Sequence, residues 1–415
     1  MGNTERADVV VVGAGVGGSA VADALAKAGL TVLVLERQVE YADHVRGEFL
    51  QPWGVAEAQR LGVFDTLVAA GGNVTSRFIV HDEALTREES EAGATPLGAL
   101  VPEVPGALGI GHPTVCRALE AAAVSSGAQV IHGVSEVKVV AGGTPEVRYV
   151  GPDGERAVSC RIVIGADGRE SGVRRQMGIE LNRTDPRVFL AGLLVSGVEA
   201  WPEGDAVVGT EGDRLFYVFP QGGGKARLYL AMRADERARL SGSDRTAHFL
   251  EGFRLDSLPG SERFAEADAA GPCAGYPMFD SWVDDPVVEG VALVGDAGGF
   301  SDPVIGQGLS IALRDARMVS EALISSPQDW SPAVLGGYVE ERAERMRRLR
   351  FAAQVFADCY EPRLAPVEER RRRIELLNGA DEDLFMVQAS VLCGSEALPP
   401  KCFEDQVRDR LLASA

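Results

Sequence analysis

The sequence predicts an α/β fold: a Rossmann-like domain, an antiparallel-sheet domain inserted into it, and a helical C-terminus. The first observation is an N-terminal order of strand, glycine-rich turn, helix and strand over residues 8–37. The second is that residues 180–275 consist mostly of strand-like runs, with a helix expected near residues 243–253. The third is helical apolar spacing over much of the chain after residue 307.

The N-terminal unit has the order of a dinucleotide-binding βαβ motif. Residues 8–12 form a run of mostly β-branched residues, and residues 13–18 read Gly-Ala-Gly-Val-Gly-Gly. Residues 19–28 have helical apolar spacing, and a second apolar run over residues 31–35 ends in Glu36. A glycine turn framed by two strands and a terminal acid indicates nucleotide binding far more specifically than the glycines alone.

Each glycine of the turn has its own expected role. Gly13 permits the tight turn, Gly15 lets the backbone approach a pyrophosphate, and Gly18 lets the helix lie close to the strand. The phosphates would lie at the helix N-terminus, where unpaired N–H groups favour negative charge. The Glu36 carboxylate would accept from ribose hydroxyls and repel a 2′-phosphate, which indicates FAD or NAD rather than NADP at this end.

Composition narrows the class of protein. The chain has 415 residues, a length for which two domains are a fair expectation. Its 41 basic and 61 acidic residues give a formal charge of −20, which argues against nucleic acid or an anionic membrane surface as a partner. No apolar run reaches about 18 residues and the start does not resemble a signal peptide, so we expect a cytoplasmic protein without integral membrane association.

The cysteines do not suggest a disulfide framework or a metal site. They are scattered without a Cys-x-x-Cys pair or a metal-ligand spacing, at Cys116, Cys160, Cys273, Cys359, Cys393 and Cys402. We therefore expect reduced thiols and no bound metal.

The changes of pattern along the chain predict the domain boundaries. The nucleotide-binding domain is expected over residues 1–73, 107–178 and 276–330, the substrate-binding domain over 74–106 and 179–275, and a helical C-terminal region over 331–415. Within these, we expect one helix over residues 53–70, an acidic hairpin or loop over 82–106, and strand structure over 129–140.

Two later motifs each follow a short apolar strand. Asp167-Gly168 follows residues 161–165, and Gly295-Asp296-Ala297 follows residues 288–294 and continues into residues 302–309. In a doubly wound sheet, loops at the carboxyl ends of strands carry the ligand site. We therefore expect both motifs to meet the glycine turn at one ligand.

Together the three motifs resemble the group A flavoprotein monooxygenases, the para-hydroxybenzoate hydroxylase-like family, from residue 6 to about residue 325. The resemblance implies FAD in a glutathione-reductase-like FAD-binding domain, with Asp296 at the ribityl chain and the 303–309 segment against the flavin ring. The Arg46 segment would lie near the flavin and the nicotinamide donor, and His112 or Arg117 would replace an arginine that usually faces FAD. The expected cofactor-binding residues are Gly13, Gly15, Val16, Gly17, Gly18, Glu36, Arg37, Arg46, Arg117, Asp167, Gly168, Gly295, Asp296, Pro303, Gly306, Gln307, Gly308 and Leu309.

Simpler interpretations of several residues stay open at this point. Asp167-Gly168 is also a common turn, Arg46 could be a surface arginine, and His112 could be a structural histidine at a helix start. Arg117 could equally be a solvated helix arginine.

The resemblance implies a single-component monooxygenase that uses NADPH or NADH and O₂ to hydroxylate or epoxidise a small hydrophobic or aromatic substrate in secondary metabolism. The flavin would carry the chemistry through a C4a-hydroperoxide, so catalytic candidates are few: Arg46, Tyr217 and His112. The expected walls of the substrate pocket are Tyr217, Phe219, Met232, Tyr276, Met278, Phe279 and Pro303. A monomer and a homodimer are both compatible with the sequence.

Three alternatives have different signals. Gly298-Gly299-Phe300 is more familiar from geranylgeranyl reductase-like and halogenase-like relatives, and favours an isoprenoid or enone reductase. Gly306-Gln307-Gly308 favours the oxygenase, and the Trp-x-Trp-x-Ile-Pro motif of halogenases is absent. A flavoprotein that binds a partner without redox chemistry is the remaining class.

Overall fold

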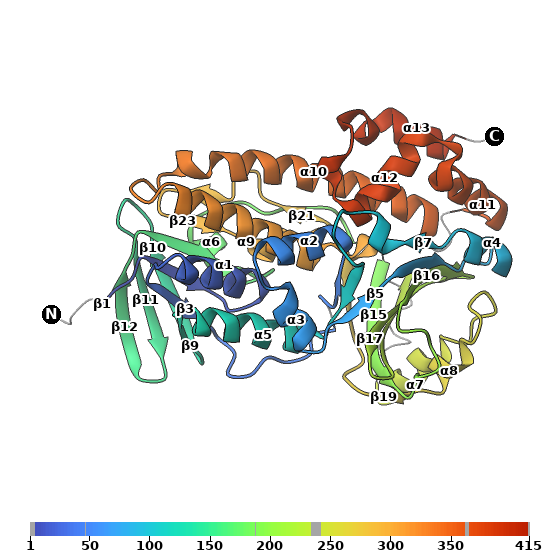
Figure 1. Cartoon of the computed structure of the whole chain (residues 1–415), viewed down its shortest axis with the longest axis horizontal. Coiled ribbons are helices and arrows are strands. Elements are labelled where there is room, and N and C mark those ends of the chain that lie inside the picture. The colour runs from blue at the N-terminus through green and yellow to red at the C-terminus, as the bar shows by residue number, and fades with distance from the viewer. Residues whose placement is uncertain (1–4, 46, 187, 234–241, 362–364, 414–415) are drawn as a thin grey trace.

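The computed structural model describes residues 5–45, 47–186, 188–233, 242–361 and 365–413, and Figure 1 shows their arrangement. The first domain is built on a six-stranded sheet in the order β22-β23-β13-β2-β3-β9. Its strands are β2 (Val9–Val12), β3 (Val32–Leu35), β9 (Gln129–Ile131), β13 (Ile162–Gly165), β22 (Val287–Val288) and β23 (Val291–Leu293). All neighbours in it are parallel except β22 and β23.

The two faces of this sheet are covered by different layers. Helices α1 (Val16–Lys27), α5 (His112–Ser125) and α9 (Gly308–Ser325) pack on the face that carries Val9 and Val11. The face that carries Val10 and Val12 packs against a four-stranded sheet of β1 (Glu5–Arg6), β12 (Gly154–Ser159), β11 (Glu146–Gly151) and β10 (Glu136–Val140). Burial on both faces explains why β2 is an unbroken run of valines.

The second domain is built on an eight-stranded sheet. Its strands are β6 (Arg77–Val80), β7 (Thr95–Pro96), β15 (Val188–Ser196), β16 (Asp205–Glu211), β17 (Arg214–Gly222), β18 (Lys225–Arg233), β19 (Asp268–Ala269) and β20 (Ala274–Met278). The predicted inserted sheet is present, but it is not wholly antiparallel. Strand β6 belongs to the earlier segment of the chain that joins this domain, before residue 107. It runs parallel to its neighbour β16.

Helices cover both faces of the second sheet. One face packs on α7 (Arg245–Glu251) and α8 (Glu262–Ala265). The other faces the C-terminal region, which consists of α10 (Gly336–Tyr360), α11 (Val367–Glu375), a π-helical turn η6 (Leu376–Ala380), α12 (Glu382–Cys393), a short 3₁₀ turn η7 (Ser395–Ala397) and α13 (Asp405–Leu412). The C-terminal helices, red in Figure 1, therefore cover one face of this eight-stranded sheet.

Three local expectations differ from the structure. Residues 53–70 contain two helices, α2 (Pro52–Arg60) and α3 (Phe64–Ala69), because Gly62 adopts a positive φ of 69° between them. Residues 129–140 contain two strands that belong to different sheets, β9 and β10. The acidic segment 82–106 contains the helix α4 (Arg87–Ala92), which a Thr86–Glu89 capping box begins.

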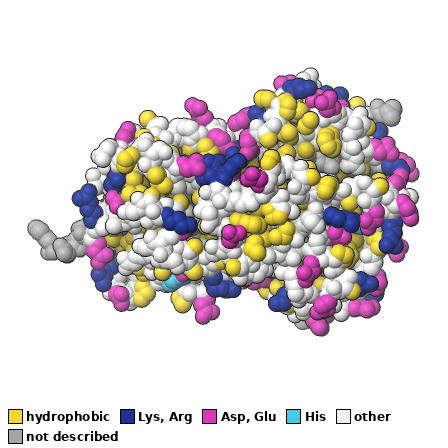
Figure 2. Space-filling model, in the orientation of Figure 1, with side chains coloured by type: hydrophobic (Ala, Val, Ile, Leu, Met, Phe, Trp, Pro, Cys, Tyr) yellow, Lys and Arg dark blue, Asp and Glu magenta, His cyan; other side chains and the backbone are white. Residues whose placement is uncertain are grey.

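The surface carries mixed charge. On the face in Figure 2, acidic and basic side chains are interspersed with apolar ones. Within the part of the chain that the structure describes, no helix is both long enough and apolar enough to cross a membrane.

Candidate active site

One elongated cavity of about 300 Å³ reaches both domains. At one end it touches the start of α1 at Gly15, and at the other it touches α4 at Glu89. Figure 1 shows these two helices far apart along the molecule. Between them the cavity passes Asp296, the 303–309 segment and the β17 strand, so it brings together motifs that are distant in the sequence.

The glycine turn has the geometry that its sequence predicts. Gly13 has φ 101°, and its N–H donates to the Leu35 carbonyl at 2.8 Å. A side chain on Gly18 would overlap the Gly13 carbonyl oxygen, because helix α1 lies directly against the turn. Gly15 lines the cavity, and nothing lies within 4 Å of the position that a Cβ there would take. The turn therefore leaves open space in front of the N-terminus of α1.

Glu36 lies at the end of β3 but does not line the cavity. Its Oε2 accepts from the Ala14 N–H and its Oε1 from the Gln38 N–H, both at 2.7 Å. The carboxylate thus braces the glycine turn, and each oxygen keeps a second lone pair for a ligand. The neighbouring Arg37 is exposed.

The Asp167 carboxylate stabilises its own loop. Its Oδ2 accepts from the N–H groups of Gly172 at 2.7 Å and Val173 at 3.1 Å, at the start of the short helix α6 (Gly172–Gln176). Gly168, with φ 78°, and Arg169 follow this anchor and line the cavity. Asp167 therefore acts by placing the next two residues at the cavity.

Asp296 presents its carboxylate to the cavity. The Arg169 Nε lies 3.2 Å from Asp296 Oδ2, and the Arg169 guanidinium lies 4.1 Å from the ring centroid of Phe300. The Asp296 side chain keeps 31% of its surface exposed, so this ion pair is weak and can be replaced by a ligand hydroxyl.

A buried arginine holds the loop that carries Asp296. Arg342 donates to the carbonyls of Gly298 at 2.8 Å, Gly299 at 3.0 Å and Gly295 at 3.2 Å. A Cβ on Gly298 would lie 3.1 Å from the Arg342 guanidinium carbon, and Gly299 has φ 102° with its Cβ position 2.5 Å from the Ser281 carbonyl oxygen. Both glycines are therefore required by packing in this loop.

The 303–309 segment forms the middle of the cavity wall. A 3₁₀ turn, η4 (Pro303–Ile305), is followed by Gly306 in the left-handed region with φ 60°, and α9 begins at Gly308. The Gln307 side chain points into the protein, where its Oε1 accepts from Trp53 Nε1 at 2.8 Å and its Nε2 donates to the Val391 carbonyl at 3.0 Å. The start of α9 is thus fixed from both sides while it faces the cavity.

Gln51 is a lining residue that the sequence patterns do not single out. It is 4% exposed, and its Nε2 donates to the Ile305 carbonyl at 3.3 Å. Its Oε1 is buried and has no hydrogen-bond partner among the described residues. No sequence signal marks Gln51, because its role depends on the distant 303–309 segment.

Four of the seven expected substrate-wall residues line the cavity. Tyr217 and Phe219 alternate on the same face of β17, and Pro303 lies opposite. The Tyr217 hydroxyl donates to the Val304 carbonyl at 3.0 Å, and Phe219 stacks on Phe49 with ring centroids 4.4 Å apart. Tyr276, from β20, also lines the cavity.

Three other expected wall residues lie elsewhere. Met232 is on the opposite face of the sheet, packed with Phe249, because side chains alternate along β18. Met278 is buried in the core behind the cavity, and Phe279 packs edge-on against Phe300 at 5.1 Å between ring centroids. Neither Met278 nor Phe279 is a lining residue.

The expected basic site residues also differ in where they lie relative to the cavity. Arg46 lies outside the described residues. His112 lines the cavity at the start of α5, with its Nε2 3.6 Å from the Cys116 Sγ. Arg117, one turn later, is exposed and does not line the cavity.

A buried charged cluster adjoins the cavity wall. Arg227 Nη2 donates to Glu48 Oε1 at 2.6 Å and to Asp43 Oδ2 at 2.7 Å, and the Tyr229 hydroxyl donates to Glu48 Oε2 at 3.0 Å. Burial raises the pKa of Glu48 in spite of the nearby Arg227. This cluster fastens the segment around Glu48 to the substrate-domain sheet.

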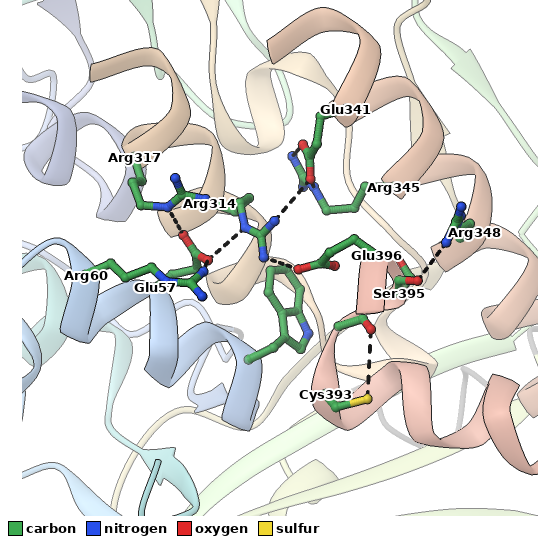
Figure 3. Close-up of polar contacts among 12 residues, drawn as sticks. Glu57, Arg60, Arg314, Arg317, Glu341, Arg345, Arg348, Cys393, Ser395 and Glu396 are labelled. Atoms are coloured by element: carbon green, nitrogen blue, oxygen red, sulfur yellow. Dashed lines mark hydrogen bonds and ion pairs between the residues drawn. The ribbon is translucent and has the colours of Figure 1, made fainter. Parts of the chain in front are cut away.

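A second polar network joins α2, α9 and the C-terminal helices behind the cavity (Figure 3). Glu57 on α2 forms ion pairs with Arg314 and Arg317 on α9. Arg314 also reaches Glu341 on α10 and Glu396 on η7. The C-terminal region is therefore held on the first domain by buried charge as well as by apolar packing.

Comparison with known proteins identifies the family. A family model described as an FAD binding domain matches residues 6–352. The chain belongs to this FAD-binding family. It is a flavoprotein of the oxidoreductase class, with the predicted Rossmann-like fold and helical C-terminus.

The flavoprotein has relatives with two kinds of activity in their names. It is 31% identical over 328 residues to digeranylgeranylglycerophospholipid reductase 2 of Methanothermobacter thermautotrophicus, covering 76% of this chain and 77% of that one. Its fold matches p-nitrophenol 4-monooxygenase PnpA of Pseudomonas putida with a TM-score of 0.79, at 20% identity over 94% and 98% of the two chains. It also matches aklavinone-11 hydroxylase, solved with FAD and aklavinone, with a TM-score of 0.69, at 20% identity over 86% and 69%.

The residues of the flavoprotein fit FAD. The open space at Gly15 suits a pyrophosphate, because the N-terminus of α1 lies beside it. Asp296 offers a half-exposed carboxylate to hydroxyl groups. The N-terminus of α9 at Gly308 lies on the same cavity and favours the negative edge of a reduced flavin ring.

Proposed function

We propose that this flavoprotein is a single-component monooxygenase that uses NADPH or NADH and O₂ to hydroxylate or epoxidise a small hydrophobic or aromatic molecule. One oxygen atom would enter the substrate and the other would leave as water, with the electron pair supplied by NAD(P)H. The observation that carries the proposal is the continuity of the cavity. The start of α9 and the aromatic walls Tyr217 and Phe219 face one common space.

The chain's residues would divide the work of binding FAD. Gly15, Val16 and Gly17 at the start of α1 would receive the pyrophosphate, Asp296 the ribityl chain, and the Gly306–Leu309 backbone the flavin ring. FAD, when bound, supplies the hydride and oxygen chemistry. The protein contributes position, electrostatics and a dry site.

Exclusion of water is what the second domain and the C-terminal region would add. Tyr217, Phe219, Phe356 and Val391 line the cavity beyond the α9 start with mostly apolar surface. The Tyr217 hydroxyl and the Gln307 amide are both engaged by backbone carbonyls, so they draw no water to this surface. A site of this kind limits loss of the oxidising equivalent to solvent.

An isoprenoid or enone reductase is the second candidate, because the reductase from Methanothermobacter is 31% identical. The Gly298-Gly299 pair, which favours the reductase in the sequence, also has a structural reason, because Gly298 packs closely on Arg342 and Gly299 on Ser281. One observation weighs against the reductase. Among the described lining residues, Arg169 is the sole arginine or lysine and it pairs with Asp296, so a phosphate headgroup would have to compete with Asp296 for this one cation.

Oxygen dependence tests the proposal. The FAD-loaded enzyme is mixed with NADPH or NADH and a panel of phenols and alkenes, with and without O₂, while nucleotide oxidation and O₂ uptake are followed. We expect an active substrate to raise both rates together and to yield a product that contains one added oxygen atom. Undiminished turnover under strict anaerobiosis would overturn the proposal in favour of the reductase.

A further inference from the structure

The cavity contains buried polar atoms that the protein leaves unpaired. The hydroxyl of Tyr360 and the Oε1 of Gln388 both belong to lining residues. Each atom is buried, and neither makes a hydrogen bond of good geometry within the described part of the chain, although the Cys359 thiol, a weak partner, lies beside the Tyr360 hydroxyl. A buried polar group left unpaired costs about 1–3 kcal/mol, so such groups in a cavity point to a ligand that pairs with them.

Tyr360 lies at the last residue of α10 and is 1% exposed. Its ring packs on Phe356 with centroids 5.3 Å apart, and its carbonyl accepts from the Thr210 hydroxyl at 2.8 Å. The backbone and the ring are therefore both fixed. Burial raises the pKa of the Tyr360 hydroxyl well above its usual value, so the group is a neutral O–H donor.

Gln388 lies on α12, which packs against α10. Its Nε2 donates to Asn378 Oδ1 at 3.3 Å, and Asn378 also lines the cavity from the η6 turn. In this orientation of the amide, the Gln388 Nε2 is the donor to the Asn378 oxygen. Gln388 Oε1 is consequently the acceptor that remains available.

We propose that Tyr360 and Gln388 form a polar subsite for a neutral hydroxyl group on an otherwise apolar substrate. A hydroxyl oxygen accepts from the Tyr360 O–H, while a hydroxyl hydrogen is donated to Gln388 Oε1. The neighbouring lining residues Phe356, Val391 and Leu392 would pack on the apolar body. The identification of the bound molecule as the substrate rests on the proposed function. The binding of a hydroxyl group at this subsite does not depend on it.

Other ligand classes fit these groups less well. A carboxylate or phosphate cannot donate to Gln388 Oε1, and Glu89 lines the same end of the cavity. Arg371, which lies beside Glu89, already pairs with it and donates to the Ala84 carbonyl. A pure hydrocarbon would leave both Tyr360 and Gln388 unpaired.

Binding of matched probes to the FAD-loaded enzyme tests the subsite without any electron donor. The probes are 2-naphthol, naphthalene and 2-naphthoate as one set, and farnesol with its hydrocarbon farnesene as another, titrated by the change in flavin absorbance. We expect at least one of the two alcohols to bind about tenfold more tightly than its hydrocarbon, and naphthoate to bind more weakly than naphthol. Tyr360→Phe and Gln388→Met should each reduce the alcohol preference several-fold and leave hydrocarbon binding unchanged.

The control variant is Tyr149→Phe, which removes a tyrosine hydroxyl from β11, away from the cavity. It should leave all probe affinities unchanged. Tyr360→Phe should leave the unfolding temperature of the enzyme without probe nearly unchanged, because the lost hydroxyl has only the weakly bonding Cys359 thiol beside it. The subsite is refuted if neither alcohol binds more tightly than its hydrocarbon, or if the two cavity variants weaken both members of a pair equally. Because neither O₂ nor NAD(P)H is present, these outcomes are independent of whether the reaction is an oxygenation.

Discussion

Replacing Asp315 by asparagine tests how the loop that carries the Gly-Asp motif is held. The Asp315 carboxylate is fully buried and accepts from the Gly295 N–H at 2.9 Å. It also lies 3.0 Å from Arg342 Nε and 2.6 Å from Arg345 Nη2. Burial by itself raises the pKa of Asp315, but the two arginines lower it further than burial raises it, so the group is ionised.

The size of the effect follows from the two arginines. Removing one partner of a buried ion pair costs roughly 3–5 kcal/mol, because the other charge is left without compensation. The Asp315→Asn variant keeps the shape and one acceptor oxygen, so we expect a loss near the lower figure, about 3 kcal/mol. The stability that a lowered pKa provides is present above the unfolded pKa and is lost as the pH falls through the folded pKa. The difference between wild type and variant should therefore shrink in acid.

Urea unfolding of both proteins, together with release of FAD, measures this effect. The matched control is Glu321→Gln on the same helix, since Glu321 forms an exposed pair with Arg317 and should contribute less than about 1 kcal/mol. We also expect Asp315→Asn to release FAD more readily, because Arg342 holds the Gly295–Gly299 carbonyls in place. An equal loss of stability in both variants, or unchanged FAD retention in Asp315→Asn, would show that the loop is positioned by other contacts.

Two further predictions concern the adenosine end. Gly18→Ala places a methyl group against the Gly13 carbonyl oxygen. We expect the free energy of unfolding in urea to fall by roughly 1–3 kcal/mol and the variant to lose FAD on gel filtration. A variant that keeps FAD would contradict this prediction. Burial lowers the pKa of His132, but hydrogen bonds to Glu120 and the Gln38 carbonyl raise it more. The stability that protonated His132 gains from these partners is fully present below the pKa of the unfolded state and is lost as the pH rises through the folded pKa. The melting temperature of wild type should therefore approach that of His132→Gln above about pH 6.5. A difference that does not change with pH would contradict the ion pair.

Short motifs were sufficient to predict the geometry of the nucleotide turn. The positive φ of Gly13 and the close contact at Gly18 follow from local backbone requirements that only glycine meets. The helix over α9 and the inserted sheet were likewise visible in apolar periodicity. The Thr86-x-x-Glu89 capping box was also present in the sequence and predicts the helix α4 that a composition-based reading treats as a loop.

The face of β18 illustrates what local pattern cannot decide. Even-numbered residues of this strand are apolar, whereas the odd-numbered face contains Arg227, so the sequence favours Met232 as a wall. The structure reverses this, because Arg227 is buried against Glu48 and Asp43, which lie far away in the sequence. Tyr229, on the face with Arg227, therefore reaches the cavity and Met232 does not. The pattern of apolar and polar residues along a strand cannot predict that a charged residue is buried, because the partner that allows its burial is distant in the sequence.

The division of the site along the chain bears on substrate choice. The family match ends at residue 352, and the glycine turn, Asp296 and the α9 start all lie within it. Tyr360 and Gln388 lie beyond it, in helices that shape the far end of the cavity. Gln307 bonds to the Val391 carbonyl and Arg314 pairs with Glu396, so these helices are attached to the segment that would face the flavin. The proposed Tyr360–Gln388 subsite can therefore differ between members of the family without a change in the segments that would hold the cofactor, whereas the walls Tyr217, Phe219 and Pro303 lie inside the matched region.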